Sequence, residues 1–303
     1  MSTEGSDHEA YAFVMLNFLI LGDWGRKGTP GQLAVADGMA RVAEQLKSRF
    51  VVTTGDNFYH GVTSLHDAHW QESYEAVYHR PSLQIPWYVV LGNHDYQGSV
   101  QAQLDYVYLS ARWCLPSRYY AVEKAINATA SALLVFLDTS PFLSSYQANG
   151  PEYIEGVRGQ DPEWQLSWLK RTLAASKAAW KLVFGHHPIY SASPYHGDTL
   201  ELQSRLLPIL QAHHVQAYIC GHEHDLQHLA ADGVDYFVSG AGAECRESGW
   251  CSASRYSVCE LGFSAVSLTG DRLRVEFYDA NGKLIYDAGK RLSTLTDNCT
   301  LSL

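Results

Sequence analysis

The chain has 303 residues, of which 46% are hydrophobic and 18% are charged, and this composition excludes a mainly disordered protein. Its 22 basic and 32 acidic residues give a formal net charge of −10 at pH 7, so it offers no basic stripe for a nucleic acid. None of its six cysteines forms a Cys-x-x-Cys pair, which argues against a thiolate zinc site or thioredoxin-like redox chemistry.

At the N-terminus, the polar residues 1–10 are expected to be a disordered lead, followed by a single catalytic domain over residues 11–303. The apolar stretch Tyr11–Leu21 is too short to span a bilayer. It also lacks the basic flank and the small-residue cleavage site of a signal peptide. We therefore expect it to form the first strand of the core.

Further along, apolar runs alternate with amphipathic stretches, which is typical of α/β proteins. The predicted strands are Phe13–Leu21, Phe50–Thr54, Trp87–Leu91, Ala132–Leu137, Lys181–Phe184 and Ala217–Cys220. The predicted helices are Gln32–Ser48, His66–His79, Glu163–Ser176 and Leu200–His213. After residue 235 the runs are strand-like, at Tyr236–Ser239, Ser264–Leu268, Arg274–Tyr278 and Lys283–Tyr286. This order predicts two packed sheets with helices outside them.

Five short motifs follow apolar runs of the chain. They are Gly22-Asp23-Trp24-Gly25, Gly55-Asp56-Asn57-Phe58-Tyr59, Gly92-Asn93-His94-Asp95, Gly185-His186-His187 and Gly221-His222-Glu223-His224. Their carboxylates, phenol, amide and imidazoles suit a pair of hard or borderline metal ions. Because open α/β sheets gather their ligands at the carboxyl ends of strands, the series predicts a binuclear metal enzyme.

The motif series resembles the purple acid phosphatases, particularly the small tartrate-resistant type, over nearly the whole chain. The patterns Gly-Asp-x-Gly, Gly-Asp-x-x-Tyr, Gly-Asn-His-Asp and Gly-His-x-His carry this resemblance. It implies the calcineurin-like metallophosphoesterase fold, a four-layer α/β/β/α sandwich of two mixed β-sheets flanked by helices. It also implies an acid phosphatase that hydrolyses phosphate monoesters by attack of a metal-bound hydroxide.

The resemblance also implies the metal ligands. Fe(III) would be bound by Asp23, Tyr59 and His224, a divalent Fe, Zn or Mn ion by Asn93, His186 and His222, and both ions by Asp56. Many related phosphoesterases carry a histidine ligand at the position of Gly25. Tyr59 is placed to substitute for that histidine, and a phenolate is a hard anionic donor that favours a trivalent ion.

Two histidines are expected to bind substrate and to protonate the leaving group. His94 directly follows the ligand Asn93, which is also expected to contact the substrate, and Asp95 is expected to orient the His94 ring. His196 lies one residue later than the family spacing, and Tyr195 occupies the matching position. Donors with a pKa near 6.5 predict an acidic pH optimum.

The other candidates receive plainer interpretations. Seven histidines that match no motif are predicted to be solvated or hydrogen-bonded surface groups, namely His60, His66, His69, His79, His213, His214 and His228. His187 is predicted to support the ligands from behind, and Cys220 to be a small core side chain. For Trp24, stacking over the site and packing in the core both stay open.

Two other functions stay open: a phosphodiesterase or nucleotidase that uses the same metals, and a non-catalytic metal-binding protein. The expected partner is a small phosphorylated substrate or a phosphoprotein, with no nucleic acid or membrane, and we expect a monomer. The resemblance implies a secreted, lysosomal or periplasm-like location. Cys245, Cys251 and Cys259 lie in a loop-like region where disulfides would suit an oxidising compartment.

Overall fold

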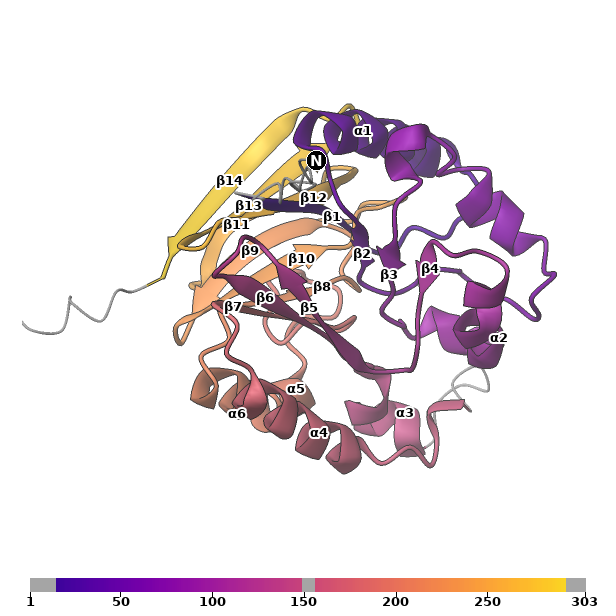
Figure 1. The fold of residues 1–303 in the computed structure, drawn as a ribbon. Coiled ribbons are helices and arrows are strands. Elements are labelled where there is room, and N and C mark those ends of the chain that lie inside the picture. Colours follow the sequence, from indigo (N-terminus) through magenta and orange to yellow (C-terminus); the bar gives the residue numbers. More distant parts are fainter. Residues whose placement is uncertain (1–14, 149–155, 293–303) are drawn as a thin grey trace, which may run out of the picture.

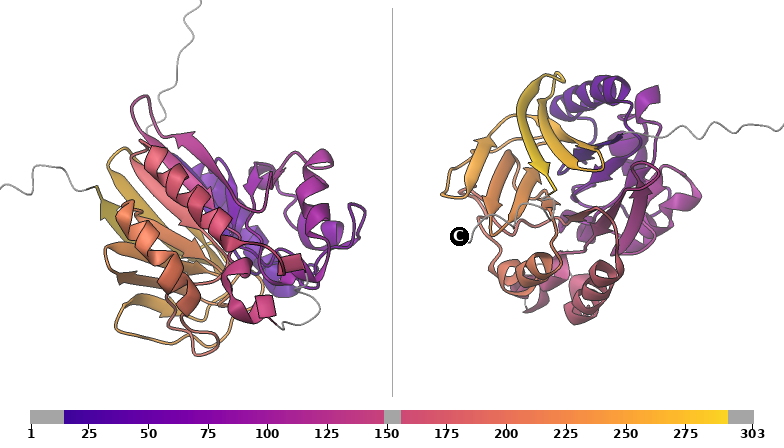
Figure 2. Two further views of the ribbon diagram at one scale, coloured as in Figure 1. Left: turned by 90° about the horizontal axis from the view of Figure 1, so that it is seen from below. Right: turned by 60° about the vertical axis from the view of Figure 1, so that its left-hand side comes forward.

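The computed structural model describes residues 15–148 and 156–292, so the expected disordered lead lies outside the described residues. Two seven-stranded sheets pack face to face, and helices cover their outer sides (Figure 1). Two further views show the same layers from below and from the side (Figure 2). This is the predicted four-layer sandwich. That residues 11–303 form a single catalytic domain stays a prediction.

The first sheet has the order β14-β13-β12-β1-β2-β3-β4. Its strands are β1 (Leu16–Leu21), β2 (Val51–Thr53), β3 (Trp87–Tyr88), β4 (Trp113–Cys114), β12 (Gly262–Leu268), β13 (Arg272–Asp279) and β14 (Leu284–Arg291). Strands β1 to β4 are parallel, and β12 pairs antiparallel with β1. The sheet is therefore mixed, and its parallel half carries the first three motifs.

The second sheet has the order β11-β9-β10-β8-β7-β6-β5. Its strands are β5 (Tyr120–Ala125), β6 (Ser131–Phe136), β7 (Trp180–Phe184), β8 (Ala217–Cys220), β9 (Leu226–Ala231), β10 (Val234–Ser239) and β11 (Ser254–Val258). Strands β6, β7, β8 and β10 are parallel, whereas β5 pairs antiparallel with β6, β9 with β10, and β11 with β9. This sheet is also mixed, and β7 and β8 lead into the last two motifs.

Helix α1 covers the first sheet, and α4, α5 and α6 cover the second (Figure 1). The α-helices are α1 (Pro30–Leu46), α2 (Val100–Asp105), α3 (Ser144–Ala148), α4 (Pro162–Ala175), α5 (Leu200–Arg205) and α6 (Leu207–Ala212). Asp161 caps α4 by accepting a hydrogen bond from the backbone N–H of Glu163. The single helix predicted over Leu200–His213 is two helices, because Pro208 has no N–H to continue the first one.

A second difference concerns the helix predicted over His66–His79. The structure has only a six-residue π-helix there, Trp70–Glu75. Trp70 and Tyr74 are buried on it, and the Ser73 hydroxyl accepts a hydrogen bond from the Lys27 backbone. Packing against Trp24 of the first motif and against the loop that follows it therefore decides this segment more than its helical periodicity does.

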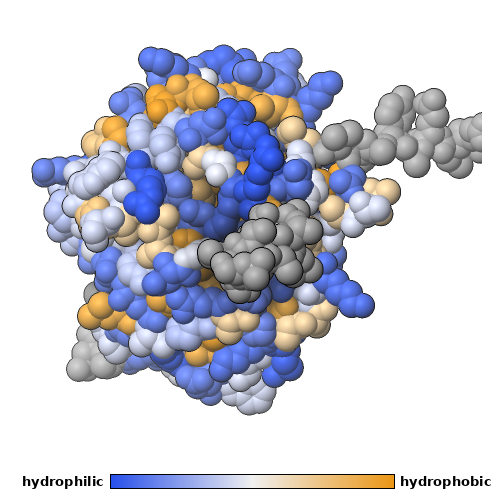
Figure 3. Space-filling view, turned by 90° about the vertical axis from the view of Figure 1, so that its left-hand side faces the viewer, coloured by the Kyte–Doolittle hydropathy of each residue, from blue (hydrophilic) through white to orange (hydrophobic). Residues whose placement is uncertain are grey.

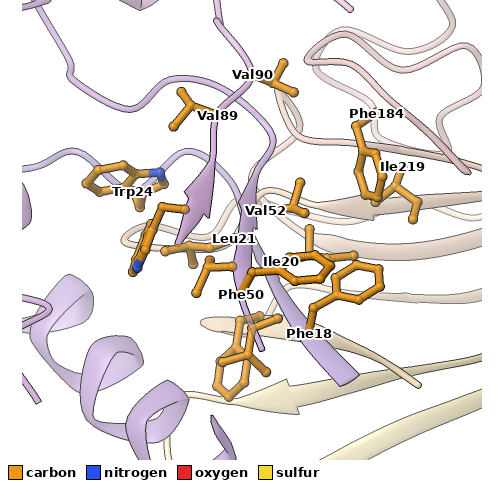
Figure 4. Close-up of a cluster of buried hydrophobic side chains, with 14 of the residues drawn as sticks. Phe18, Ile20, Leu21, Trp24, Phe50, Val52, Val89, Val90, Phe184 and Ile219 are labelled. Carbon is orange, nitrogen blue, oxygen red and sulfur yellow. The ribbon is translucent and has the colours of Figure 1, made fainter. Parts of the chain in front are cut away.

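Large apolar side chains fill the space between the sheets (Figure 4). Phe18 stacks on Phe50 with ring centroids 4.6 Å apart, and Phe184 from the second sheet meets Phe18 edge-on at 6.4 Å. Trp24 is fully buried and packs edge-on against Trp87 and other aromatic rings. Its role is therefore core packing. Each such side chain contributes about 1.5–3 kcal/mol of burial free energy.

The side of the molecule that carries β14 is covered mainly by hydrophilic residues, with hydrophobic ones in smaller groups (Figure 3). Among the described residues, no helix is both long and apolar enough to cross a bilayer. Cys220 is buried on β8, as predicted for a core side chain.

Candidate metal centre

The five motifs meet at one edge of the sandwich. Asp23 and Asp56 follow the adjacent parallel strands β1 and β2, and Asn93 follows β3. His186 and His222 follow β7 and β8, which are neighbours in the second sheet. Because parallel strands end at the same edge, the two sheets bring ligands from both halves of the chain together.

The backbone at this edge is strained. Asp23 has φ = 58°, Asp56 has φ = 50° and His222 has φ = 70°, all in the left-handed region that non-glycine residues avoid. Such conformations cost about 1–2 kcal/mol each and persist where the surroundings impose them, most often at functional sites. Here three candidate ligands carry the strain.

Gly25 explains why tyrosine replaces histidine as a donor. A Cβ atom at Gly25 would lie 1.8 Å from the backbone oxygen of Asn57. The Gly25 oxygen also accepts a 3.1 Å hydrogen bond from the Tyr59 backbone N–H. The turn that delivers Tyr59 thus occupies the space that any side chain at position 25 would need. Glycine here and tyrosine at position 59 are two consequences of one packing arrangement.

One half of the cluster centres on Tyr59. Its hydroxyl oxygen lies 2.8 Å from His224 Nε2, and that nitrogen lies 3.6 Å from Asp23 Oδ1. Asp23 Oδ2 accepts a hydrogen bond from the His222 backbone, whereas its buried Oδ1 has no hydrogen-bond partner among the described residues. Burial and the charges of Asp23 and Asp56 raise the pKa of Tyr59, against the opposing charge of Arg26. A cation between these three donors would satisfy them all.

The other half centres on His186, whose Nε2 lies 3.1 Å from Asn93 Oδ1, 3.2 Å from His222 Nδ1 and 3.4 Å from Asp56 Oδ1. Its Nδ1 lies 2.8 Å from the backbone oxygen of Thr54, which can only accept, so Nδ1 carries the proton. The lone pair of Nε2 then faces two oxygen atoms. Lone pairs that face one another in a buried site repel, and a cation bound between them removes that repulsion.

The ionisation states fit two bound cations. Burial and the charge of Asp56 raise the pKa of the Asp23 carboxyl well above its usual value. Burial lowers the pKa of His186, and burial with the neighbouring histidines lowers that of His222. The imidazoles are therefore neutral and free to coordinate, while the buried carboxylates need positive charge. Asp56 offers a ligand atom within 4.8 Å of those of both Asp23 and His186, as a bridging ligand would.

His187 lies beside this cluster, and its ligand nitrogen is within 4.8 Å of those of His186 and His222, but its hydrogen bonds argue against a ligand role. The Thr139 hydroxyl accepts the backbone N–H groups of both His186 and His187, which leaves its proton for His187 Nδ1 at 2.8 Å. The proton of this neutral ring then sits on Nε2, which lies 3.4 Å from the Tyr146 hydroxyl. The prediction of a supporting role agrees with this tautomer.

His94 borders the cluster with its ring centroid 4.6 Å from that of Tyr59. Its backbone N–H donates to Asp56 Oδ1 at 2.9 Å, and the side-chain amide of Gln97 hydrogen-bonds its Nδ1 at 2.8 Å. The fully buried carboxylate of Asp95 instead accepts hydrogen bonds from Asn57, Phe58, Gly92 and Gln103. Asp95 therefore ties the second and third motifs together, and Gln97 is the side chain that hydrogen-bonds the His94 ring.

His196 reaches the cluster despite its shifted position in the sequence. Its ring centroid lies 4.2 Å from that of His222. The backbone N–H groups of His196 and Gly197 both donate to Glu223 Oε1, at 3.3 and 3.0 Å. The buried Glu223, which lies between the two histidines of the last motif, thus fixes this loop. His196 therefore reaches the cluster although it comes one residue later than the family spacing. Glu223 is part of the last motif, but no role was predicted for it from the sequence.

The comparison with known proteins agrees with this geometry. Residues 16–226 match the family model of the calcineurin-like phosphoesterases. Purple acid phosphatase 3 of Arabidopsis thaliana is 39% identical over 284 residues, which cover 89% of this chain and 76% of that protein. Tartrate-resistant acid phosphatase type 5 of Homo sapiens is 36% identical over 298 residues, which cover 89% of each chain.

The chain belongs to the purple acid phosphatase family. Membership makes it a metal-dependent phosphoesterase with a binuclear metal centre. Among solved structures it is also similar to GAP50, the anchor in the inner membrane complex of Plasmodium, with a TM-score of 0.80 and 25% identity. That match covers 93% of this chain and 90% of the other.

Two histidines of this purple acid phosphatase family member, His69 and His228, were predicted to be surface groups, and that prediction was wrong. His69 is buried, and its Nδ1 lies 3.2 Å from the Gly61 backbone oxygen. His228 is buried on β9 between Asp235 and Tyr286, with ring nitrogens 3.1 and 2.8 Å from their oxygens. Strand β9 was not predicted, because its polar residues interrupt the alternation of apolar and polar side chains that indicates a strand.

Asp138 supports the centre from behind. It follows β6, and its side chain accepts hydrogen bonds from the Tyr96 hydroxyl and the Ser140 backbone. The side chain of Gln165, on α4, accepts a hydrogen bond from the Asp138 backbone N–H and donates one to the Asp138 backbone oxygen. Thr139, the next residue, holds both histidines of the fourth motif. Burial raises the pKa of Asp138 from 3.8 to about 7, although Tyr96 opposes the shift.

The Asp138→Asn variant should therefore have an altered pH dependence of stability. The folded protein keeps the Asp138 proton up to about pH 7, whereas the unfolded chain loses it near pH 3.8. This group thus lowers the free energy of unfolding as the pH rises through that window, by up to about 4 kcal/mol. The amide that replaces the carboxyl does not titrate, so the variant should gain stability relative to the wild type between pH 4 and 8. Urea denaturation at each pH measures the difference.

The matched control is Asp271→Asn, which makes the same change at an exposed turn. Comparing variant and wild type at each pH cancels the contribution of bound metal. A constant difference between Asp138→Asn and the wild type from pH 4 to 8 would contradict the prediction.

Proposed function

We propose that the chain is an acid phosphatase that hydrolyses phosphate monoesters with an Fe(III) ion and one divalent ion. The observation that carries the proposal is the Tyr59 hydroxyl, 2.8 Å from His224 Nε2 in a buried pocket with Asp23. A phenolate in the ligand set favours a trivalent ion over a second divalent one. Asn93, His186 and His222 would hold the divalent ion, which would be Fe, Zn or Mn, and Asp56 would contact both ions.

The charges support a phosphorylated substrate. The two ions carry five positive charges, and the ligands Asp23, Asp56 and Tyr59 carry three negative ones. The centre therefore attracts a phosphate monoester even though the chain has a net charge of −10. When bound, two such ions neutralise phosphoryl oxygens and make a water molecule acidic enough to act as the nucleophile.

His94 and His196 are the proposed proton donors for the leaving group. The Gln97 side-chain amide lies 2.8 Å from Nδ1 of His94, which leaves Nε2 as the ring nitrogen that would deliver a proton when the ring is protonated. That nitrogen lies 4.0 Å from Asp56 Oδ2, at the edge of the metal cluster. His196 is exposed, and its ring lies against that of His222, one of the candidate ligands of the other half of the cluster. Both rings are thus placed to protonate an alkoxide that leaves a phosphate held between them.

The visible spectrum of natively purified protein tests this proposal. The wild type should show a tyrosinate-to-iron charge-transfer band, and Tyr59→Phe should lose it because only a phenolate supplies the donor orbital. Tyr195→Phe, an exposed tyrosine beside His196, is the matched control and should keep the band. An iron-free, colourless wild type with full activity on p-nitrophenyl phosphate would overturn the Fe(III) assignment.

A second candidate is a non-catalytic protein, which the similarity to the GAP50 anchor favours. The complete cluster of candidate ligands supports catalysis instead, as do the two histidines at its edge, His94 and His196, here called the rim histidines. Assays with p-nitrophenyl phosphate from pH 4 to 8 separate the two. Faster cleavage of bis(p-nitrophenyl) phosphate than of the monoester would favour a phosphodiesterase.

The cellular compartment is part of this proposal. Cys245 and Cys259 form a disulfide that closes the loop from residue 245 to 259. A disulfide in a small loop supports an oxidising compartment, as in secreted or lysosomal proteins.

A further inference from the structure

The loop after β10 places a charged pair beside the tyrosine half of the centre. Glu244 Oε2 lies 2.8 Å from Arg26 Nη2, and Glu244 Oε1 lies 3.4 Å from Arg246 Nε. Cys245, between the two charged residues of this loop, is joined to Cys259 by the disulfide. The backbone of Arg246 also donates to the His224 oxygen at 2.7 Å. Glu244 is thus held on a fixed loop next to a candidate ligand.

Arg26 lies on the face of Tyr59. Its guanidinium carbon is 3.7 Å from the ring centroid, and only 25% of its side chain is exposed. The Arg26 backbone N–H donates to the buried side chain of Gln32, which fixes the start of this loop. A guanidinium at this distance is attracted by the electron-rich ring face. The contact is stronger when the ring belongs to a phenolate.

Glu244 determines where the arginine points. The buried carboxylate of Asp23 is close enough to feel the charge of Arg26, which lowers its pKa against the effect of burial. The 2.8 Å ion pair with Glu244 holds the guanidinium over the tyrosine ring, with its carbon 3.7 Å from the ring centroid. A planar guanidinium can pair with a carboxylate along its edge and stack through its face at the same time, which an ammonium cannot do.

We propose that Arg26 is a positioning residue for Tyr59, which fixes the ring and weakens electron donation from its oxygen to iron. The inference rests on the proposed function, because it requires Tyr59 to bind Fe(III). The guanidinium carbon lies 3.7 Å from the ring centroid, so its positive charge acts directly on the phenolate and stabilises the donor orbital. Arg26 therefore raises the energy of the charge transfer from tyrosinate to iron.

Arg26→Met tests this inference by the position of the charge-transfer band. Methionine keeps the length and the apolar contact but loses the charge, so the band should move to longer wavelength by about 10–20 nm. Iron content measured on the same sample shows that the centre is loaded. Arg26→Lys keeps the charge without the flat face and should move the band by a smaller amount in the same direction.

The matched control is Lys27→Met. Lys27 is the next residue, is 60% exposed and pairs with Glu72, so the change removes the same charge away from the ring. Its band should stay at the wild-type position. An unshifted band in iron-loaded Arg26→Met would overturn the inference and leave the proposed function intact, as would an equal shift in Lys27→Met. Absence of the band from the wild type would instead overturn the Fe(III) assignment, and this inference with it.

Discussion

Asp56→Asn is expected to lower the kcat for p-nitrophenyl phosphate by at least about 10³-fold and to reduce the metal content of the protein. Asparagine has nearly the same shape as aspartate but cannot bring negative charge to two cations at once. Asp56 also accepts the His94 backbone N–H at 2.9 Å, and asparagine can retain that bond through its oxygen. The loss should therefore reflect charge at the centre and not a displaced third motif.

The measurement combines metal analysis of natively purified protein with steady-state kinetics. Asp37→Asn is the control, because Asp37 is an exposed residue of α1 that pairs with Arg80. Its kcat and metal content should equal those of the wild type, and its stability should change by no more than about 0.5 kcal/mol. Two metal ions per chain and unchanged turnover in Asp56→Asn would show that this carboxylate is not the bridge.

His94→Ala should lower kcat for an alkyl phosphate by about 10²-fold or more while both metals stay bound. The histidine contacts the cluster through its backbone and its ring but supplies none of the proposed ligands. The effect should be smaller with p-nitrophenyl phosphate, because p-nitrophenolate leaves readily without a proton. A ratio of losses that depends on the leaving group identifies a proton donor and not a general structural defect.

His66→Ala, at an exposed histidine that belongs to none of the motifs, serves as the control and should leave both rates unchanged. If His94→Ala lost activity equally on the alkyl and the nitrophenyl substrate, the donor role would be wrong. His196→Ala in the same pair of assays shows whether the second rim histidine shares the step.

Most of the metal cluster could be predicted because each candidate ligand sits in a local pattern. An apolar run that ends in Gly-Asp or Gly-His predicts both the strand and the polar residue after it, as at Asp23 and His186. The parallel order of β1, β2 and β3 then brings the motif ends together. The two packed sheets and the outer helices followed from the alternation of apolar and amphipathic stretches, whereas the mixed strand order was implied by the family resemblance.

Other elements could not be predicted from periodicity. Strands β4 and β9 are too short or too polar to show alternation, and they form because neighbouring strands pair with them. The π-helix at Trp70–Glu75 is shaped by its contacts with Trp24 of the first motif and with the backbone of Lys27. In each case tertiary packing outweighs the local preference of the segment.

By itself, the amino-acid sequence determined the type of fold, the candidate ligands and their chemistry, because these depend on residues close together in the chain. Only the tertiary structure decided the supporting contacts. Thr139 sets the proton of His187 from 48 residues away, and Glu244 holds Arg26 against Tyr59 from a loop of the other half of the chain. Such contacts have no local pattern, because they arise only when two sheets pack and bring distant loops to a common edge.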